Sequence, residues 1–420
     1  MLNDINWRKI GMMFLILSIV FTGVSFGTPV SYAASSEVYV ASNGSDTSGD
    51  GTKENPYATL YTAYQNDNSG GTIYVLDNIK TLSDTNKKYN LNKIFTITTA
   101  PGVTETAVIE RNQAGNGTLF DLNTGQLTLK NIIIDGTYQG GALAQGRIIN
   151  VYDAQLNIEE GTVLRNSYSP FVGSAIYLGQ GSAVLKMTGG EITGNKGEKN
   201  QSNAMGAVYI GSGSKFLLTG GRITNNIGGG VDLVSGTFDL SGNATVMGNT
   251  DWGQQKALNV FLQGKTNLTL SGEFSGKAGI TAQSRMAAGG IFGQAATGDL
   301  ASLENLIADD SSLYAIYGAS NELLWKAPPT VMIEQPAGDK VFNSKPMFEG
   351  TSTAGSTITV EIKDKAGNVV DTPTVTVDAD GKWTFTPTND LTDGEYTVAV
   401  TATIDGKSTK AEKVITIVDE

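Results

Sequence analysis

The fold is decided by a stretch that occurs twice in close succession. Residues 185–195 read Leu185-Lys186-Met187-Thr188-Gly189-Gly190-Glu191-Ile192-Thr193-Gly194-Asn195, and residues 216–226 read Phe216-Leu217-Leu218-Thr219-Gly220-Gly221-Arg222-Ile223-Thr224-Asn225-Asn226. Each copy has a short alternating strand, a Gly-Gly turn and a β-branched residue that is followed three positions later by Asn. This shared order indicates a structural unit that the chain uses repeatedly.

The same unit can be followed in both directions from this pair, over residues 117–250. Its alternating strand recurs every 22 to 31 residues, beginning at Leu127, Leu156, Leu185, Phe216 and Phe238. Strands this short cannot bury a face alone, but rungs stacked about 4.8 Å apart bury one continuous core. The repeats therefore predict an all-β chain built around a parallel β-helix, which the rule for parallel crossovers makes right-handed.

A polar residue follows the β-branched position of every repeat. An Asn at the same corner of successive rungs can adopt the left-handed conformation and hydrogen-bond to its neighbours. We therefore expect a structural ladder of Asp135, Asn166, Asn195, Asn226 and Asn249. An antiparallel β-sandwich with Gly turns is the alternative fold, but it needs neither equal rungs nor a repeated corner Asn.

Residues 1–33 have the pattern of a secretory signal peptide. Arg8 and Lys9 precede an apolar run over residues 10–26, and Ser31-Tyr32-Ala33 places small residues before the expected cleavage after Ala33. An uncleaved membrane anchor is the alternative. Because no later apolar run approaches about 18 residues, we expect an extracellular protein, secreted or associated with the cell surface, with no membrane contact after signal removal.

Composition limits the possible functions. The net charge of -12 makes nucleic acid an unfavourable partner. The chain has no Cys and no His, which excludes disulfides, Cys and His nucleophile systems and the commonest zinc ligands. Acid-base chemistry would have to use Asp, Glu, Lys, Arg or Tyr.

The N-terminal block carries a family resemblance. Residues 39–46 read Tyr39-Val40-Ala41-Ser42-Asn43-Gly44-Ser45-Asp46, and residues 51–60 read Gly51-Thr52-Lys53-Glu54-Asn55-Pro56-Tyr57-Ala58-Thr59-Leu60. This block resembles the opening of extracellular bacterial β-helix proteins of the pectate-lyase-like superfamily. The resemblance covers about residues 36–326 and is specific mainly at this block. It implies a short helix, with Leu60, Ala63 and Tyr64 buried, that covers a first rung at residues 70–75.

The chain changes character near residue 327. The β-helix domain is expected over residues 34–326, with a cap made of a helix over residues 298–307 and a hairpin over residues 314–325. The sequence Ala327-Pro328-Pro329 is typical of a linker.

Residues 330–420 contain seven short alternating strands, which fit an immunoglobulin-like sandwich with Trp383 in its core. This segment resembles the bacterial Ig-like domains of surface adhesins, on Gly350-Thr351-Ser352-Thr353-Ala354-Gly355-Ser356 and Asp380-Gly381-Lys382-Trp383-Thr384-Phe385-Thr386-Pro387.

The flank of a β-helix offers a large, rigid surface for binding. Counting back from the anchored Leu or Phe of each repeat, the residues that point outward from its first strand are Asp121, Asn150, Tyr177, Tyr209, Asp232 and Asn259. Tyrosine faces between amides and carboxylates suit an extended sugar chain. Tyr and Asn are also good strand and ladder residues that need no ligand.

Calcium is a possible cofactor, and no other is indicated. Asn43, Asp46 and Asp50 place three oxygen-bearing side chains on one Gly-Ser loop, which is suitable chemistry for a hard cation. Turn-forming Asx residues give the same pattern, and this structural interpretation is the simpler one.

Three functions remain open. The resemblance implies a polysaccharide lyase or glycoside hydrolase, yet we assign no catalytic residue. None of the flank cations lies beside two carboxylates in register; the nearest approach is Arg165 with Asp135 and Glu159-Glu160, which we interpret as solvated corner residues. We therefore favour a non-catalytic adhesin-type protein that contacts an extracellular polysaccharide or another surface ligand. A structural spacer is the third possibility.

Overall fold

The computed structural model describes residues 37–418, with gaps at 68–69, 82–88, 113–116, 138–145, 180, 198–205, 264–267, 284–285, 297–299 and 310–312. The signal peptide and its cleavage after Ala33 lie outside the described residues and stay predictions. Neither of the two short helices in the described part of the chain has the length and apolar character needed to cross a bilayer.

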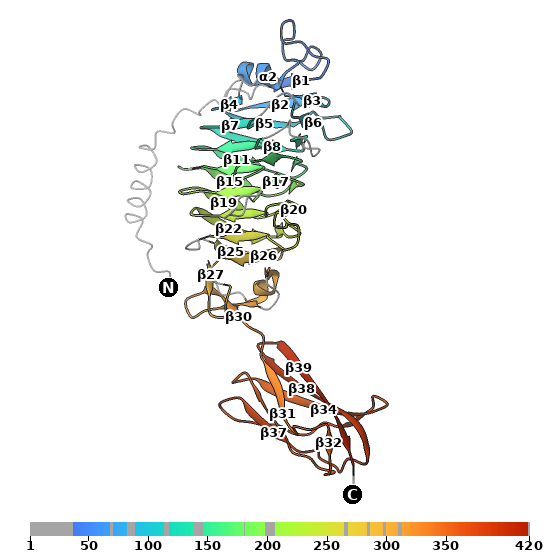
Figure 1. Ribbon diagram of the computed structural model, residues 1–420. Helices are drawn as coiled ribbons and strands as arrows, with labels where there is room; N and C mark the ends of the chain where they lie inside the picture. The colour runs from blue at the N-terminus through green and yellow to red at the C-terminus, as the bar shows by residue number, and fades with distance from the viewer. Residues whose placement is uncertain are drawn as a thin grey trace, which may run out of the picture.

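The N-terminal domain is a solenoid whose parallel strands stack one above another (Figure 1). The pairings follow three stacks, called the first, second and third sheets, which belong to one continuous sheet; β26 (Lys277–Ala282) joins the first to the third. The first sheet contains β4 (Tyr89–Leu91), β7 (Phe120–Leu122), β10 (Ile149–Val151), β14 (Ile176–Leu178), β18 (Val208–Ile210), β21 (Val231–Leu233) and β24 (Val260–Leu262). The second contains β1 (Glu37–Val40), β2 (Gly71–Val75), β5 (Ile94–Thr99), β8 (Gln126–Lys130), β11 (Gln155–Ile158), β15 (Val184–Met187), β19 (Lys215–Leu218), β22 (Thr237–Gly242), β25 (Leu268–Phe274) and β27 (Ile291–Ala295).

The third sheet contains β3 (Ile79–Lys80), β6 (Val108–Glu110), β9 (Ile133–Asp135), β12 (Val163–Arg165), β16 (Glu191–Thr193), β20 (Arg222–Thr224), β23 (Thr245–Val246), β26 (Lys277–Ala282) and β28 (Leu306–Ala308). A two-stranded sheet of β13 (Tyr168–Ser169) and β17 (Lys196–Gly197) lies outside these three. The prediction of a parallel β-helix is confirmed.

The repeated apolar residues form the core of the solenoid. Leu127, Leu156, Leu185, Phe216 and Phe238 lie opposite one another in register, and each is fully buried. Phe216 and Phe238 stack with ring centroids 5.0 Å apart. Burying a side chain of this size contributes about 1.5–3 kcal/mol, so stacking equivalent residues supplies the stability that no single rung has.

The N-terminal block covers the open end of the solenoid. Helix α2 (Leu60–Asn66) buries Leu60, Ala63 and Tyr64, as predicted. The first rung is β2, with β1 stacked on it in parallel. The following loop then returns along β1: Tyr57 N donates to Tyr39 O at 3.0 Å, and Ala41 N donates to Tyr57 O at 3.0 Å. These bonds occupy an edge that would otherwise be free to pair with another chain.

The C-terminal cap differs from its prediction in one element. The expected helix over residues 298–307 is a short 3-10 helix, η1 (Leu300–Asn305), and the chain then extends into β28. Leu306 continues the third sheet by pairing with Ala278 of β26, so it cannot stay helical. The hairpin of β29 (Tyr314–Tyr317) and β30 (Glu322–Lys326) follows as predicted, and Trp325 stacks on Phe292 at 4.0 Å.

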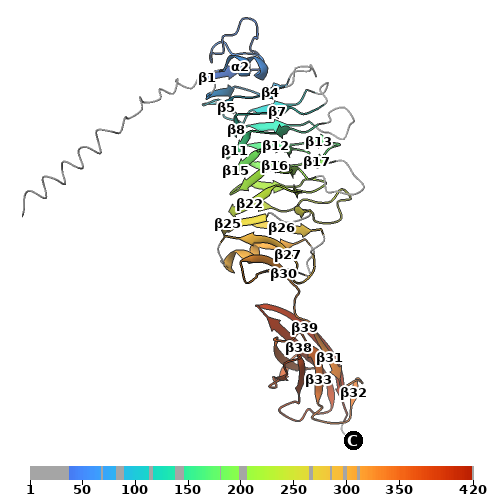
Figure 2. The same cartoon turned by 90° about the vertical axis from the view of Figure 1, so that its left-hand side faces the viewer.

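Residues beyond the linker form a sandwich of two sheets with a separate core (Figure 2). One sheet contains β31 (Val331–Gln335), β33 (Phe348–Ser352), β37 (Lys382–Phe385) and β36 (Thr376–Val377). The other contains β32 (Lys340–Val341), β39 (Lys407–Ile417), β38 (Gly394–Ile404), β34 (Thr357–Asp364) and β35 (Val369–Asp371). Trp383 is fully buried between them, as expected for a core residue.

A ladder of buried Asn side chains runs along one corner of the solenoid. Asn195 N and Nδ2 donate to Asn226 Oδ1, both at 3.0 Å, and Asn226 repeats these two bonds to Asn249 Oδ1 at 3.1 and 2.9 Å. Asn249 in turn donates to Asn259 Oδ1, and Asn259 donates to Asp309. Asp309 suits the end of the ladder because a carboxylate accepts without needing an acceptor of its own.

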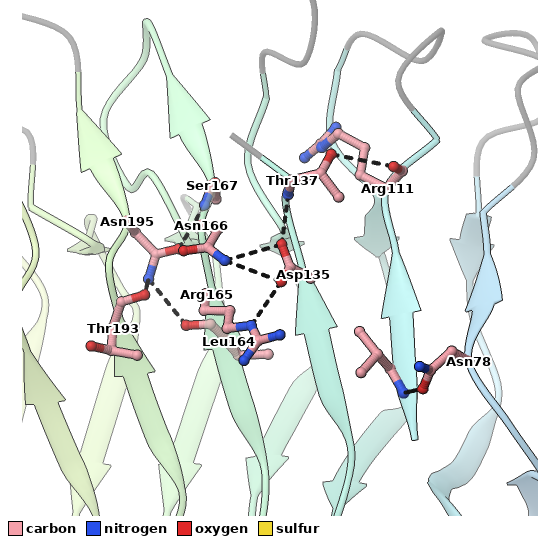
Figure 3. A network of polar contacts seen from close by, with 11 residues as sticks. Asn78, Arg111, Asp135, Thr137, Leu164, Arg165, Asn166, Ser167, Thr193 and Asn195 are labelled. Carbon is pink, nitrogen blue, oxygen red and sulfur yellow. Dashed lines mark hydrogen bonds and ion pairs between the residues drawn. The ribbon is translucent and has the colours of Figure 1, made fainter. Parts of the chain in front are cut away.

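Two predicted ladder residues, Asp135 and Asn166, lie outside this file (Figure 3). Asp135 is opposite Arg165, and Ser167 rather than Asn166 donates its N–H to Asn195 Oδ1 at 3.1 Å. Asn166 instead has a left-handed backbone, with φ 55°, and so occupies the corner that Gly194, Asn225 and Gly248 fill in the next rungs. The left-handed residue thus precedes the ladder residue. The partner of Ile192 is Leu164, one residue later than the spacing predicts, and the partner of Leu164 is Ile134, two residues later than predicted.

Candidate functional site

The outward side chains of the first sheet form a continuous file across five rungs. In register, Asp121 is opposite Asn150, Asn150 is opposite Tyr177, Tyr177 is opposite Tyr209, and Tyr209 is opposite Asp232. The structure therefore brings together five of the six residues expected there. Asn259 does not belong to the file, because Asp232 is opposite Phe261 and Asn259 is a ladder residue. The binding role of the file stays a prediction.

Glycines beside the file let its aromatic rings lie against the sheet. A Cβ added to Gly179 would lie 2.9 Å from Tyr152 Cδ1 and 3.2 Å from Tyr177 Cε1, and one added to Gly211 would lie 3.3 Å from Tyr209 Cε1. Tyr152 therefore joins the cluster, although sequence analysis did not identify it. The repeated order Tyr-x-Gly at residues 177–179 and 209–211 is the sequence signal for this packing.

The tyrosines contact one another and an arginine. The rings of Tyr177 and Tyr209 stack with centroids 5.2 Å apart and planes 16° from parallel, while Tyr152 meets Tyr177 edge-on at 6.4 Å. Arg147 Cζ lies 4.5 Å from the Tyr177 centroid and 5.4 Å from that of Phe171, whose side chain is exposed. At least one face of each stacked ring is thus covered, so the expected flat tyrosine platform for sugars is only partly free.

A buried arginine holds the backbone that carries Arg147. Arg111 is 2% exposed and donates from Nη2 to Gly146 O at 2.9 Å and to Arg147 O at 2.8 Å. Burial lowers the pKa of Arg111 to about 10, which leaves it charged at neutral pH. The Arg147 side chain is fixed in turn by a bond from Nε to Val172 O at 2.7 Å. Burial lowers the pKa of Arg147 as well, against the favourable effect of nearby Tyr177.

Two residues of the file are covered. Asn150 is 6% exposed and donates from Nδ2 to Asp121 Oδ1 at 2.7 Å. Asp232 is fully buried; its Oδ1 accepts from Gln263 Nε2 at 2.7 Å, and its Oδ2 has no partner in the part of the chain that the structure describes. Burial raises the pKa of Asp232 to about 7, although the Gln263 bond opposes this shift. The accessible cluster is therefore Arg147, Tyr152, Tyr177 and Tyr209, with Asp121 at one end and Phe171 beside it.

The three candidate calcium ligands make separate contacts. Asp46 Oδ1 accepts from the backbone N–H groups of Ala58 and Thr59, both at 2.9 Å, and so supports the start of α2. Asp50 Oδ1 accepts from Thr52 N at 3.0 Å and Oγ1 at 2.7 Å, and these bonds lower the pKa of Asp50. Asn43 lies in the turn before them. Within the described ranges, no group of three or more acidic side chains is placed to hold a metal ion. Calcium binding stays untested.

Contacts in the third sheet show that the interpretation of Arg165 and Asp135 as solvated corner residues was wrong. Arg165 and Asp135 were expected to be solvated corner residues, but Arg165 Nε lies 2.7 Å from Asp135 Oδ2 and Asp135 is buried (Figure 3). Asn166 Nδ2 also donates to Asp135 Oδ2 at 3.1 Å. The carboxylate is thus fully engaged in a structural contact that links two rungs.

Comparison with known proteins assigns the C-terminal domain. Residues 336–420 match the family model described as a bacterial Ig-like domain. The chain is therefore a β-solenoid protein with a bacterial Ig-like domain at its C-terminus. A search of curated proteins finds no match.

Three solved structures show low similarity. CopC from Methylosinus trichosporium OB3b is 19% identical, with a TM-score of 0.19, over 21% of this chain and 92% of CopC. An engineered protein is 24% identical, with a TM-score of 0.19, over 27% of this chain and 25% of its own. Chitinase ChiW from Paenibacillus sp. str. FPU-7, a cell-surface-expressed multi-modular enzyme, is 12% identical, with a TM-score of 0.21, over 91% of this chain and 24% of ChiW. TM-scores this low establish neither a shared overall fold nor a function.

Proposed function

We propose that this protein is an extracellular, non-catalytic binding protein whose first-sheet face contacts a carbohydrate polymer or a similar surface ligand. The observation that carries the proposal is the half-exposed cluster of Arg147, Tyr152, Tyr177 and Tyr209. Phenol hydroxyls and a guanidinium offer hydrogen bonds beside aromatic edges, a mixture that suits the alternating polar and apolar surface of sugars. A rigid sheet presents this mixture without an ordering cost.

The arrangement of carboxylates favours binding over hydrolysis. Asp121 and Asp232 are the two acids of the file and lie four rungs apart, roughly 19 Å at the usual strand spacing. The paired carboxylates of glycoside hydrolases are only about 5 to 9.5 Å apart. Asp135, the acid beside Arg165, is already paired and buried. A lyase or hydrolase is therefore the less favoured alternative.

Binding can be tested by applying residues 34–420 to a glycan array. Replacing Tyr177 and Tyr209 together with Ala should weaken binding by roughly 1–3 kcal/mol, which is about 5- to 150-fold. The matched control replaces Tyr39 and Tyr74 with Ala. These two tyrosines stack in the same way, with centroids 5.1 Å apart, but they lie on the second sheet. The control should retain full affinity.

Activity assays on the bound glycans complete the test. Incubation should release neither reducing ends nor unsaturated products. Product formation would show that the protein is an enzyme, and an equal loss of binding in both double variants would place the ligand elsewhere. Failure to bind any glycan or surface polymer would leave the spacer function, which the continuous core of the solenoid also suits.

A further inference from the structure

The solenoid and the Ig-like domain touch beyond the linker that connects them. The turn between β38 and β39 places Asp405 against the hairpin of β29 and β30, where Lys326 Nζ lies 2.5 Å from Asp405 Oδ2. Tyr314 OH donates to the same carboxylate oxygen at 3.4 Å, and Lys407 Nζ lies 5.7 Å from the Tyr314 ring centroid. The hydrogen bond to Asp405 raises the pKa of Lys326, so the lysine is charged at neutral pH.

Both sides of this contact are held in place by their own strands. Asp405 and Gly406 have φ angles of 51° and 72°, the conformation of a two-residue hairpin turn that matches the twist of its strands. The strands β38 and β39 have 11 residues each and pair along their whole length. On the solenoid side, Tyr314 and Lys326 are direct cross-strand partners. A preformed carboxylate therefore meets a preformed pair of donors.

The contact is small and polar. An open groove of about 770 Å³ lies beside it, lined by apolar residues of the cap such as Leu306, Leu313 and Ile316 and by the Asp405 turn. Interfaces between domains of one chain usually bury about 600–1,500 Å², and the domains can move relative to each other unless the interface is large and hydrophobic. The two domains contact each other here through an ion pair, a hydrogen bond and a cation–π contact. Salt should screen the exposed ion pair strongly, because the Debye length falls to about 3 Å at 1 M ionic strength.

We propose that Asp405, Lys326 and Tyr314 form an ionic latch that holds the Ig-like domain at one angle to the solenoid. When the charge pair is removed or screened, the domain pivots on the Pro328-Pro329 linker. The linker itself has no side-chain charge and is stiffened only by its two prolines. The latch thus decides whether the two modules move as one body or separately, and it is independent of any ligand on the first sheet.

The absence of native Cys allows a direct test by paired spin labels. Exposed Glu273 on the solenoid and exposed Lys365 on the Ig-like domain are replaced with Cys and labelled, and the distribution of distances between them is measured. The otherwise unchanged protein should give one narrow distribution at low salt and a broad one at about 1 M salt. Asp405→Asn keeps a residue that tolerates the left-handed turn but removes the charge, and should broaden the distribution at low salt.

A second latch variant and a matched control complete the design. Lys326→Gln should broaden the distribution as Asp405→Asn does. Asp380→Asn removes an exposed carboxylate elsewhere on the Ig-like domain and should leave the distribution narrow. A broad distribution in the protein with an intact latch would overturn the proposal. A distribution that stays narrow in both latch variants would overturn it as well, because the angle would then be set by other contacts.

Discussion

Asp232 shows how one side chain can make stability depend on pH. Its carboxyl has a pKa of about 7 in the folded protein, raised by burial from the usual 3.8. The unfolded chain therefore loses this proton near pH 4, while the folded chain keeps it until about pH 7. The contribution of the neutral carboxyl to the free energy of unfolding is therefore at its maximum below pH 4, and it is lost as the pH rises through 7. The loss reaches up to about 4 kcal/mol.

Asp232→Asn should remove this loss. We expect the variant to be more stable than the parent at pH 8 and to differ little from it at pH 4, as measured by urea unfolding at both values. Asp153→Asn is the control. The Asp153 carboxylate accepts bonds from Ser182 that lower its pKa, so this substitution should not raise stability at pH 8. An Asp232→Asn variant with unchanged stability at pH 8 would show that the carboxyl is not buried as described.

Asn225 and Asn226 are adjacent residues with opposite roles. Asn225 has φ 56°, a conformation that Gly adopts freely, whereas Asn226 is buried and bonded to the Asn on either side of it. Asn225→Gly should therefore leave the free energy of unfolding within about 0.5 kcal/mol of the parent. Asn226→Gly leaves the Asn195 N–H without its acceptor and should cost about 1–3 kcal/mol. Urea unfolding of the two variants compares them directly, and equal effects would argue against the ladder.

Individual residues also show how much of the candidate site could be predicted from the sequence. Tyr177 and Tyr209 could be aligned because each begins a Tyr-x-Gly order shortly before an anchored residue, Tyr177 eight residues before Leu185 and Tyr209 seven residues before Phe216. Asn166 and Asn259 were misplaced because counting from a strand does not reveal which residue turns the corner. That choice depends on hydrogen-bond register, and on whether the left-handed conformation falls on a Gly or an Asn. Burial of Asp232 likewise depends on neighbours that are distant in sequence.

At the scale of elements, the N-terminal cap can be tested through Asp46. Its carboxylate accepts two backbone N–H groups and the Thr59 hydroxyl at the start of α2. Asp46→Ala should lower the free energy of unfolding by about 1–2 kcal/mol, because these donors lose their acceptor. The matched control is Asp50→Ala, which removes contacts to Thr52 and Asn55 within an exposed turn and should have a smaller effect.

Chelation separates this structural role from calcium binding. If Asp46 acts through its hydrogen bonds, the thermal midpoint should be the same with EDTA and with added calcium. A midpoint that falls with EDTA in the parent, but not in the Asp46→Ala variant, would instead support the metal site. The family resemblance predicted the capping helix, but not the role of Asp46, because its contacts to Ala58 and Thr59 join residues 12 and 13 positions apart. The C-terminal helix was overestimated because sheet pairing at Leu306 overrides helical spacing.

At the scale of the whole molecule, the solenoid and the Ig-like domain have separate cores, so each should unfold as its own unit. Gly350 tests this independence: a Cβ at this position would lie 1.9 Å from Met332 O and 2.2 Å from Trp383 Cζ2. Gly350→Ala should therefore lower the midpoint of the Ig-like domain by roughly 10 °C or more, by overpacking a small core. Calorimetry should show the solenoid transition unchanged. Gly338→Ala, whose Cβ would meet nothing closer than 3.7 Å, should move neither transition. If Gly350→Ala shifted both transitions together, the latch at Asp405 would have to couple the two domains into one cooperative unit.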